Sequence, residues 1–228
     1  MHKLFRRMFS AYGPSMEPFV ILLAGPIQAN DLLRREVAGR RCIAADRGMM
    51  HATVLDLVPE LWVGDFDSAP TELSDLHADV PRAEFPRDKD MTDGEIAIEE
   101  AIRRGARSLL LVGALGGPRT DHAFAHLVLA LRYGASHDLT LFDGRERAVP
   151  LRLGETRMRS VAGAAFSILR FGDVEGLTIR NARWPLDSVS LPFSSILTQS
   201  NEATGEEIVV NLAKGQAILI AQASAEKD

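Results

Sequence analysis

Residues 61–68 read LWVGDFDS, and residues 85–95 read FPRDKDMTDGE. The apolar run 61–63 is typical of a short buried strand, which Gly64 ends. Asp65 and Asp67 follow directly, and in an extended backbone side chains two residues apart point the same way. Two carboxylates that close repel each other unless a cation lies between them, and Mg²⁺ prefers oxygen ligands. We therefore expect a metal-phosphate site here, although a lone Asp-x-Asp also occurs in solvated turns.

The second acidic cluster, residues 88–93, reads DKDMTD and includes Lys89 and Asp90. It ends in Thr92-Asp93-Gly94-Glu95, a capping-box pattern that predicts a helix from Asp93 to about residue 104. Alone, such a pattern only starts a helix. Lys89 is one of only four lysines among 26 basic residues, so it does not belong to a lysine-rich surface. Two acidic clusters, each after a predicted strand, together indicate a binding site.

Composition limits the class of protein. The 228 residues are enough for one large domain or two modest ones, each with a buried core. The net charge of −5 and the pI near 5.7 argue against a general nucleic-acid binder, which normally has a strongly basic face. The acidic net charge is still compatible with a phosphorylated ligand, because a metal ion can bind carboxylates and phosphates together. We expect no nucleic-acid partner.

The start of the chain carries basic residues and a later apolar run, 19–24, of only six residues. Glycines, prolines and a glutamate separate the two parts, so we expect neither a signal peptide nor a membrane span. The single cysteine, Cys42, excludes an intrachain disulfide and falls in a predicted buried strand. This cysteine usage suits a cytoplasmic protein.

The first part of the chain alternates predicted strands and helices. Strands are expected at 19–24, 42–45, 61–63, 83–85, 108–112 and 139–142, and helices at 31–38, 49–55, 93–104 and 120–131. Such alternation predicts a mostly parallel sheet covered on both faces, a three-layer α/β domain over residues 18–148. Ligands bind at the carboxyl ends of parallel strands. Asp46, Asp65, Asp67, the acidic run 88–93 and the loop 113–121 all follow strands, so we expect them at one edge.

The sequence pattern changes after about residue 149, where no further long amphipathic helix is expected. Short segments with β character are expected at 165–169, 177–179, 188–191, 208–212 and 217–220, separated by Gly, Pro, Asp and Asn. They predict an all-β sandwich domain over residues 149–222, with a frayed tail from residue 221 onward.

The glycine-rich loop, residues 113–122, reads GALGGPRTDH and joins a strand to a helix. Backbone N–H groups and a helix N-terminus in such a loop could hold phosphate oxygens, and Arg119 adds a suitable cation. The loop fits neither the Walker A pattern nor Gly-x-Gly-x-x-Gly. Glycines in a strand-to-helix turn often serve only the turn, so this loop is informative only beside the acidic clusters.

An ordered set of motifs resembles the thiamine pyrophosphokinase family over roughly residues 19–221. The set comprises Asp46-Arg47-Gly48, Gly64-Asp65-Phe66-Asp67-Ser68, Phe85-Pro86 with Lys89-Asp90-Met91-Thr92-Asp93 and Glu95, Gly116-Gly117-Pro118-Arg119-Thr120-Asp121-His122, residues 172–177 (GDVEGL), Trp184-Pro185-Leu186 and Ser200-Asn201-Glu202. Two departures stand out. Arg47 occupies a position where the family usually has glycine, and Pro118 lengthens the usual Gly-Gly-Arg-x-Asp-His pattern by one residue.

The resemblance implies transfer of the β,γ-pyrophosphoryl group of ATP to the hydroxyl of thiamine, with release of AMP. It implies Mg²⁺ on Asp65, Asp67 and Asp93. The residues that it places around ATP are Asp46, Lys89, Asp90, Thr92, Arg119 and Asp121. Either Asp93 or Asp121 could also accept the hydroxyl proton, because the reaction needs a group in that role.

The resemblance further implies a homodimer in which thiamine lies between the α/β domain of one subunit and the β-domain of the other. Ser200 and Asn201 then become candidates for polar contacts to the pyrimidine. Trp184 is a stacking candidate, with core packing as its alternative. His122 and His126 are one helical turn apart, but with no Cys or third His nearby we expect capping or core roles.

Two other functions fit part of the pattern. Asp-x-Asp after a strand also suits a metal-dependent nucleotide-sugar transferase, although the separate β-domain and the helix start at Asp93 count against it. A non-catalytic nucleotide or thiamine sensor could keep the binding residues. The complete set of carboxylates argues against a sensor, which could lose Asp67 or Asp93 without losing its fold.

Overall fold

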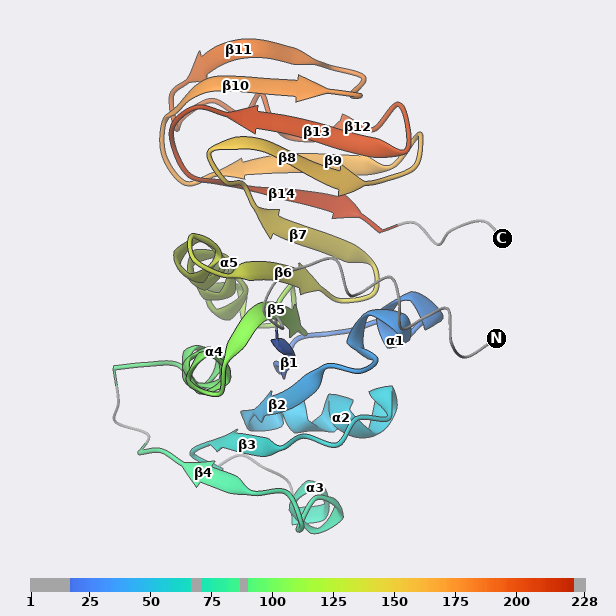
Figure 1. Ribbon diagram of the computed structural model, residues 1–228, viewed down its shortest axis with the longest axis vertical. Coiled ribbons are helices and arrows are strands. Elements are labelled where there is room, and N and C mark those ends of the chain that lie inside the picture. Colours follow the sequence, from blue (N-terminus) through green and yellow to red (C-terminus); the bar gives the residue numbers. More distant parts are fainter. Residues whose placement is uncertain (1–16, 67–70, 87–89, 224–228) are drawn as a thin grey trace.

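A computed structural model describes residues 17–66, 71–86 and 90–223. Its central feature is a ten-stranded sheet in the order β12-β9-β14-β7-β6-β5-β1-β2-β3-β4 (Figure 1). Six neighbouring strands of this sheet are parallel. They are β1 (Glu17–Leu22), β2 (Arg41–Ala45), β3 (Leu61–Gly64), β4 (Arg82–Glu84), β5 (Ala106–Val112) and β6 (Asp138–Phe142).

Helices cover both faces of the parallel strands, as apolar strands without alternation require. One face carries α1 (Asp31–Val37), the 3₁₀ helix η2 (Asp46–Met49), α2 (Met50–Leu55) and α3 (Thr71–Leu76). The other face carries α4 (Asp93–Arg103) and α5 (Thr120–Gly134) (Figure 1). Each face has its own buried core: Leu33 and Met49 belong to the first, and Ile98 and Ala130 to the second. The predicted three-layer α/β region is confirmed.

The remaining strands build the β-rich half. The large sheet continues through β7 (Glu146–Pro150), β14 (Ala217–Gln222), β9 (Ala165–Arg170) and the short β12 (Asn201–Glu202). A second, four-stranded sheet has the order β11 (Leu186–Leu191), β10 (Val174–Arg180), β13 (Glu207–Leu212) and β8 (Gly154–Arg159). Side chains of both sheets, such as Ile168 and Leu219 from one and Leu177 and Ile208 from the other, share a core. The four-stranded sheet is antiparallel throughout, and it confirms the predicted C-terminal β region.

The two halves share a strand. The predicted boundary between residues 148 and 149 lies within β7, which pairs with β6 on one side and β14 on the other. The boundary itself stays a prediction. The expected frayed tail from residue 221 is wrong at its start, because Ala221 is buried and pairs with Arg147 and Phe166 within β14.

The topology gathers many loops at one edge of the large sheet. The parallel strands β1 to β6 all end there, and the chain order reverses between β1 and β5, which makes a switch point. The antiparallel pairings place the start of β7 and β9 and the end of β14 and β12 at the same edge. In the described residues, no helix is long and apolar enough to cross a membrane.

Candidate functional site

Three aspartates from separate elements meet at this edge. Asp46 follows β2, Asp65 follows β3, and Asp93 begins α4. The pKa of Asp46 is raised above its ordinary value, first by burial and then by the negative charges of Asp93 and Asp65. The carboxylate of Asp46 therefore lies close enough to those of Asp93 and Asp65 to be repelled by both. This is the arrangement expected from three strands that end side by side.

The backbone around Asp46 is closely fixed. Asp46 has a left-handed φ of 44°, and its carbonyl accepts a 2.8 Å hydrogen bond from Trp62 Nε1. Gly64 lies so near that an added Cβ would be 3.4 Å from Asp46 Cα. Within the described part of the chain, Asp46 Oδ1 is buried and has no hydrogen-bond partner. A buried carboxylate oxygen in that state is ready to bind a cation or a donor group.

The chain turns sharply after Asp65. Phe66 has a left-handed φ of 57°, and its ring packs edge-on against Trp62 with centroids 5.0 Å apart. The guanidinium of Arg82 lies 4.7 Å from the centroid of Trp62 and 5.4 Å from that of Phe66. The expectation of an extended backbone through Phe66 is therefore wrong, because this aromatic contact turns the residue inward. Asp67, the expected partner of Asp65, lies outside the described residues.

The second acidic cluster leads into α4. Thr92 caps the helix, and its Oγ1 accepts a 3.2 Å hydrogen bond from Glu95 N, so the predicted helix start is confirmed. A Cβ on Gly94 would lie 3.1 Å from Leu23 Cδ2 and 3.4 Å from His126 Nε2. This close packing fixes the start of α4 against the end of β1 and against α5. Asp90 is exposed just before the helix, and Lys89 lies outside the described residues.

At the switch point between β1 and β5, two glycines bring the backbones of two loops into direct contact. Gly25 N donates to Gly113 O at 2.9 Å, and a Cβ on Gly25 would lie 2.4 Å from that oxygen. Gly113 has a φ of 73°, and its Cβ would lie 2.2 Å from Leu23 O. Only glycine allows the two loops to approach this closely. The result is a rigid junction beside the acidic residues.

Two histidines support this junction from either side. His51 Nε2 lies 2.8 Å from Gly25 O, and His126 Nδ1 lies 3.0 Å from Ala114 O. Burial lowers the pKa of both rings, so they remain neutral at neutral pH. His126 thus has the structural role expected for it, and His122 is exposed.

Arg119 and Asp121 form an ion pair where the glycine-rich loop meets α5. Arg119 Nε and Nη2 donate to the two oxygens of Asp121 at 2.9 and 2.6 Å, and both side chains are largely exposed. These hydrogen bonds lower the pKa of Asp121 to about 2. Arg47, one of the two departures from the family pattern, is exposed in η2, and Pro118 is exposed in the loop.

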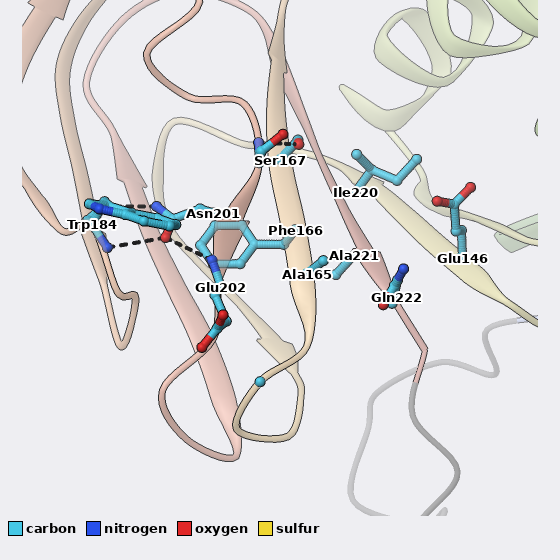
Figure 2. Close-up of a pocket in the computed structure, with 12 residues that line it drawn as sticks. Glu146, Ala165, Phe166, Ser167, Trp184, Asn201, Glu202, Ile220, Ala221 and Gln222 are labelled. Carbon is cyan, nitrogen blue, oxygen red and sulfur yellow. Dashed lines mark hydrogen bonds between the residues drawn. The ribbon is translucent and has the colours of Figure 1, made fainter.

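Ser200, Asn201 and Trp184 line one hollow of about 290 Å³ in the β-rich half. Figure 2 shows Asn201 and Trp184 side by side in it. Asn201 is buried, and its amide is used by the backbone. Its Oδ1 accepts from Trp184 N at 3.2 Å and from Glu202 N at 2.8 Å, and its Nδ2 donates to Trp184 O at 2.8 Å. Trp184 is 54% exposed, so the core-packing alternative for it is wrong.

Other residues of this hollow were not predicted from the sequence. Glu146, Phe166, Ser167 and Gln222 also line it. Phe166 and Ile168 point into the sandwich core, so Ser167 between them points to the opposite face. This alternation in β9 was a usable signal. Glu146 and Gln222 face each other across β7 and β14, a pairing that the sequence does not reveal.

The hollow and the aspartates are far apart within one chain. Both lie at the same edge of the large sheet, but six strand spacings separate β2 from β9. Neighbouring strands are about 4.8 Å apart, which makes this separation about 29 Å along the sheet. The structure therefore brings together Asp46, Asp65 and Asp93 as one group and Ser200, Asn201 and Trp184 as another.

The chemistry of the acidic group suits a hard divalent cation. Its side-chain donors are carboxylate oxygens, one of them buried without a partner, and a cation between them would relieve the repulsion that raises the pKa of Asp46. Among the described residues, no three His, Cys, Asp or Glu side chains are already gathered closely enough to hold a metal.

Known proteins give a consistent match to both halves. The family model "Thiamin pyrophosphokinase, catalytic domain" matches residues 38–142, and "Thiamin pyrophosphokinase, vitamin B1 binding domain" matches residues 155–216. Comparison with curated protein sequences gives no significant match.

Solved structures show the same fold. A thiamine pyrophosphokinase from Bacillus subtilis is 21% identical with a TM-score of 0.78, over 91% of this chain and 100% of that one. One from Geobacillus thermodenitrificans is 26% identical with a TM-score of 0.77, over 91% and 98%. One from Candida albicans is 12% identical with a TM-score of 0.72, over 92% and 90%. The two family models together cover most of the chain, in the order of its two halves, and the chain belongs to the thiamin pyrophosphokinase family of enzymes.

Proposed function

We propose that this enzyme transfers the β,γ-pyrophosphoryl group of ATP to the hydroxyl of thiamine, giving thiamine diphosphate and AMP. The observation that carries the proposal is the meeting of Asp46, Asp65 and Asp93 at the edge where the parallel strands end. Phosphoryl-type transfer consists mostly of positioning and charge neutralisation, which such an edge can supply. The match to both family domains supports thiamine as the acceptor.

Mg²⁺ is the cation that we propose for the acidic group. Asp65, Asp67 and Asp93 would hold it, with Asp46 beside them. When bound, the ion supplies positive charge that neutralises the phosphate oxygens of ATP. The buried Oδ1 of Asp46, which has no hydrogen-bond partner in the described residues, and the repulsion of Asp46 by Asp93 and Asp65 support this assignment.

The chain's own residues then orient ATP and move the proton. We place Lys89, Asp90, Thr92 and Arg119 around the nucleotide, with the N-terminus of α5 facing its phosphates. While Arg119 holds the pKa of Asp121 near 2, Asp121 accepts a proton poorly. If Arg119 turns to the phosphates, Asp121 regains its ordinary basicity. The choice of Asp93 or Asp121 as base therefore depends on whether ATP breaks this ion pair.

Thiamine would bind in the hollow that contains Ser200, Asn201 and Trp184. Its polar ring atoms would meet Ser200, and Trp184 offers an exposed aromatic surface. A small molecule cannot span the roughly 29 Å of sheet between this hollow and the aspartates of the same chain. We therefore propose a homodimer in which the hollow of one subunit faces the acidic edge of the other. We further propose a cytoplasmic enzyme with no nucleic-acid or membrane partner.

The test is AMP release from Mg²⁺-ATP by the purified protein, with and without thiamine, beside an Asp67→Ala variant. We expect thiamine-dependent AMP that the variant loses. Formation of ADP would show transfer of a single phosphoryl group and overturn the mechanism. Thiamine binding without turnover would favour the sensor, and transfer to a sugar acceptor would favour the nucleotide-sugar transferase. The family match favours neither alternative.

A further inference from the structure

One side chain of the core lies between two of the acidic loops. Trp62 is a residue of β3, which has β2 and β4 as its neighbours (Figure 1). Its indole is fully buried on the face of the sheet that α1, α2 and α3 cover. A buried indole needs a partner for its N–H. Trp62 Nε1 donates to the carbonyl of Asp46 at 2.8 Å, so this side chain reaches from β3 to the residue that follows β2.

This hydrogen bond fixes the backbone of Asp46 in a conformation that residues other than glycine rarely adopt. The φ of Asp46 is 44°, and left-handed backbone at such a residue costs about 1–3 kcal/mol, so it persists only where the surroundings hold it. Within the described residues, the buried Oδ1 of Asp46 has no hydrogen-bond partner, so no bond to this oxygen keeps it in place. The orientation of Oδ1 therefore depends on the backbone that Trp62 holds.

The ring of Trp62 contacts the second of the two loops. It packs edge-on against Phe66, the residue after Asp65, with centroids 5.0 Å apart, and Phe66 has a left-handed φ of 57°. Arg82 of β4 covers both rings, with its guanidinium 4.7 Å from the centroid of Trp62 and 5.4 Å from that of Phe66. Arg82 Nη2 also donates to Ser74 O in α3 at 3.0 Å. The turn after Asp65 is therefore held by packing against the indole ring.

We propose that Trp62 is a positioning residue for the cation site, and that it sets the carboxylates of Asp46 and Asp65 without touching the cation or the nucleotide. Its two contacts act on the two loops separately, the N–H on Asp46 and the ring on the residue after Asp65. Mg²⁺ demands near-ideal octahedral geometry, and residues that orient metal ligands typically contribute about 10–100-fold to metal affinity. The inference rests on the proposed function, which gives the acidic group a bound cation.

Core packing alone does not explain the choice of this side chain. Other large, fully buried side chains of the same core, such as Phe142 and Leu33, carry no N–H that must be bonded. An indole N–H buried without a partner would cost about 1–3 kcal/mol, so tryptophan suits this position only where a carbonyl accepts from it. Trp62→Phe separates the two roles, because phenylalanine keeps an aromatic ring beside Phe66 and removes the donor to Asp46.

The experiment measures Mn²⁺ binding to the wild type, Trp62→Phe and Phe142→Leu, with the free ion quantified by electron paramagnetic resonance. Mn²⁺ is the probe because it takes the same octahedral oxygen ligands as Mg²⁺. Phe142→Leu is the matched control, because it removes a similar volume from the same core in β6, which β5 and β1 separate from β2. We expect Trp62→Phe to bind Mn²⁺ at least about tenfold more weakly than the wild type, and Phe142→Leu to bind it as the wild type does. Urea unfolding should show a loss of stability in both variants.

Turnover separates this inference from the proposed function. Trp62→Phe should raise KM for Mg²⁺-ATP at least about tenfold and leave KM for thiamine unchanged, whereas a loss of folded protein alone would lower the rate at unchanged KM. A Trp62→Phe protein that binds Mn²⁺ and Mg²⁺-ATP as the wild type does would overturn the inference, even if both proteins make AMP with thiamine. A wild type that binds no Mn²⁺ would overturn it as well. A wild type that binds Mn²⁺ more tightly than Trp62→Phe, but makes no AMP with thiamine, would leave the inference standing and reject the proposed reaction.

Discussion

Replacing Asp46 with asparagine should stabilise the metal-free protein. The ionised carboxylate of Asp46 is partly buried, faces Asp65 and Asp93, and has one buried oxygen without a hydrogen-bond partner in the described residues. Asparagine keeps the shape of the side chain and removes the charge. In the metal-free wild type, the charged carboxylate of Asp46 thus destabilises the folded state locally, as expected where a cation would bind.

The expected gain follows from the unsatisfied group. Leaving a buried polar group without a partner costs about 1–3 kcal/mol. Asp46 is only partly buried, and asparagine still places an uncompensated polar atom there, so we expect about 1 kcal/mol of stabilisation. For a chain of this size, that corresponds to a rise in Tm of about 2–4 °C.

The gain should depend on pH in a definite direction. The folded protein raises the pKa of Asp46 above its ordinary value of 3.8, so it binds this proton more tightly than the unfolded chain does. Protonation of Asp46 therefore stabilises the folded wild-type protein at low pH. This stabilisation is lost as the pH rises through the raised pKa. The advantage of Asp46→Asn should be complete above that pKa and disappear as the pH falls toward the ordinary value.

The assay is thermal unfolding with a chelator present, at neutral and at acidic pH, beside Asp187→Asn as an exposed control on β11. Added Mg²⁺ should then stabilise the wild type more than Asp46→Asn. An Asp46→Asn protein that is no more stable than the wild type at neutral pH would refute the claim that this carboxylate is held in an unfavourable place.

Three further changes test other parts of the site. Gly48→Ala places a Cβ 2.1 Å from Leu22 O and should destabilise the protein in urea unfolding by about 1–3 kcal/mol or more, whereas Gly205→Ala, in open space, should not. Arg119→Ala should raise the pKa of Asp121 from about 2 toward 3.8, because the hydrogen bonds from Arg119 to Asp121 are lost. NMR titration of Asp121 measures this change, and an unchanged pKa would contradict the ion pair. Asn201→Ala removes three hydrogen bonds to the backbone. It should lower the free energy of unfolding by about 1–3 kcal/mol and weaken thiamine binding. Unchanged stability would contradict the structural role of Asn201.

The parallel half of the fold was predictable because its signals are local. The apolar run that begins at Phe19 predicts the strand β1, and Thr92 predicts the start of α4; both predictions are confirmed. The short helix α3 of that half and the strands β7, β8 and β12 were not predicted. β8 is mostly polar, with only Met158 buried, because it is one of the two edge strands of its sheet. β7 has charged residues and a terminal proline, and it is a strand only through its pairing with β6 and β14.

The candidate site divides in the same way. The rule that ligand-binding loops follow parallel strands places Asp46, Asp65 and Asp93 at one edge without knowledge of any contact. Two features were beyond that rule. The left-handed Phe66 depends on the packing of its ring against Trp62, and the low pKa of Asp121 depends on a rotamer of Arg119. Both are side-chain contacts that the sequence does not specify.

The most direct test of the central claim follows the two terminal phosphorus atoms of ATP. The protein is incubated with thiamine, Mg²⁺ and ATP that is labelled with radioactive phosphorus at either the β or the γ position, and the products are separated. We predict that both labels appear in thiamine diphosphate and that the AMP is unlabelled, because the pyrophosphoryl group moves as one unit. A β label that remains in ADP while the γ label alone reaches thiamine would contradict the account.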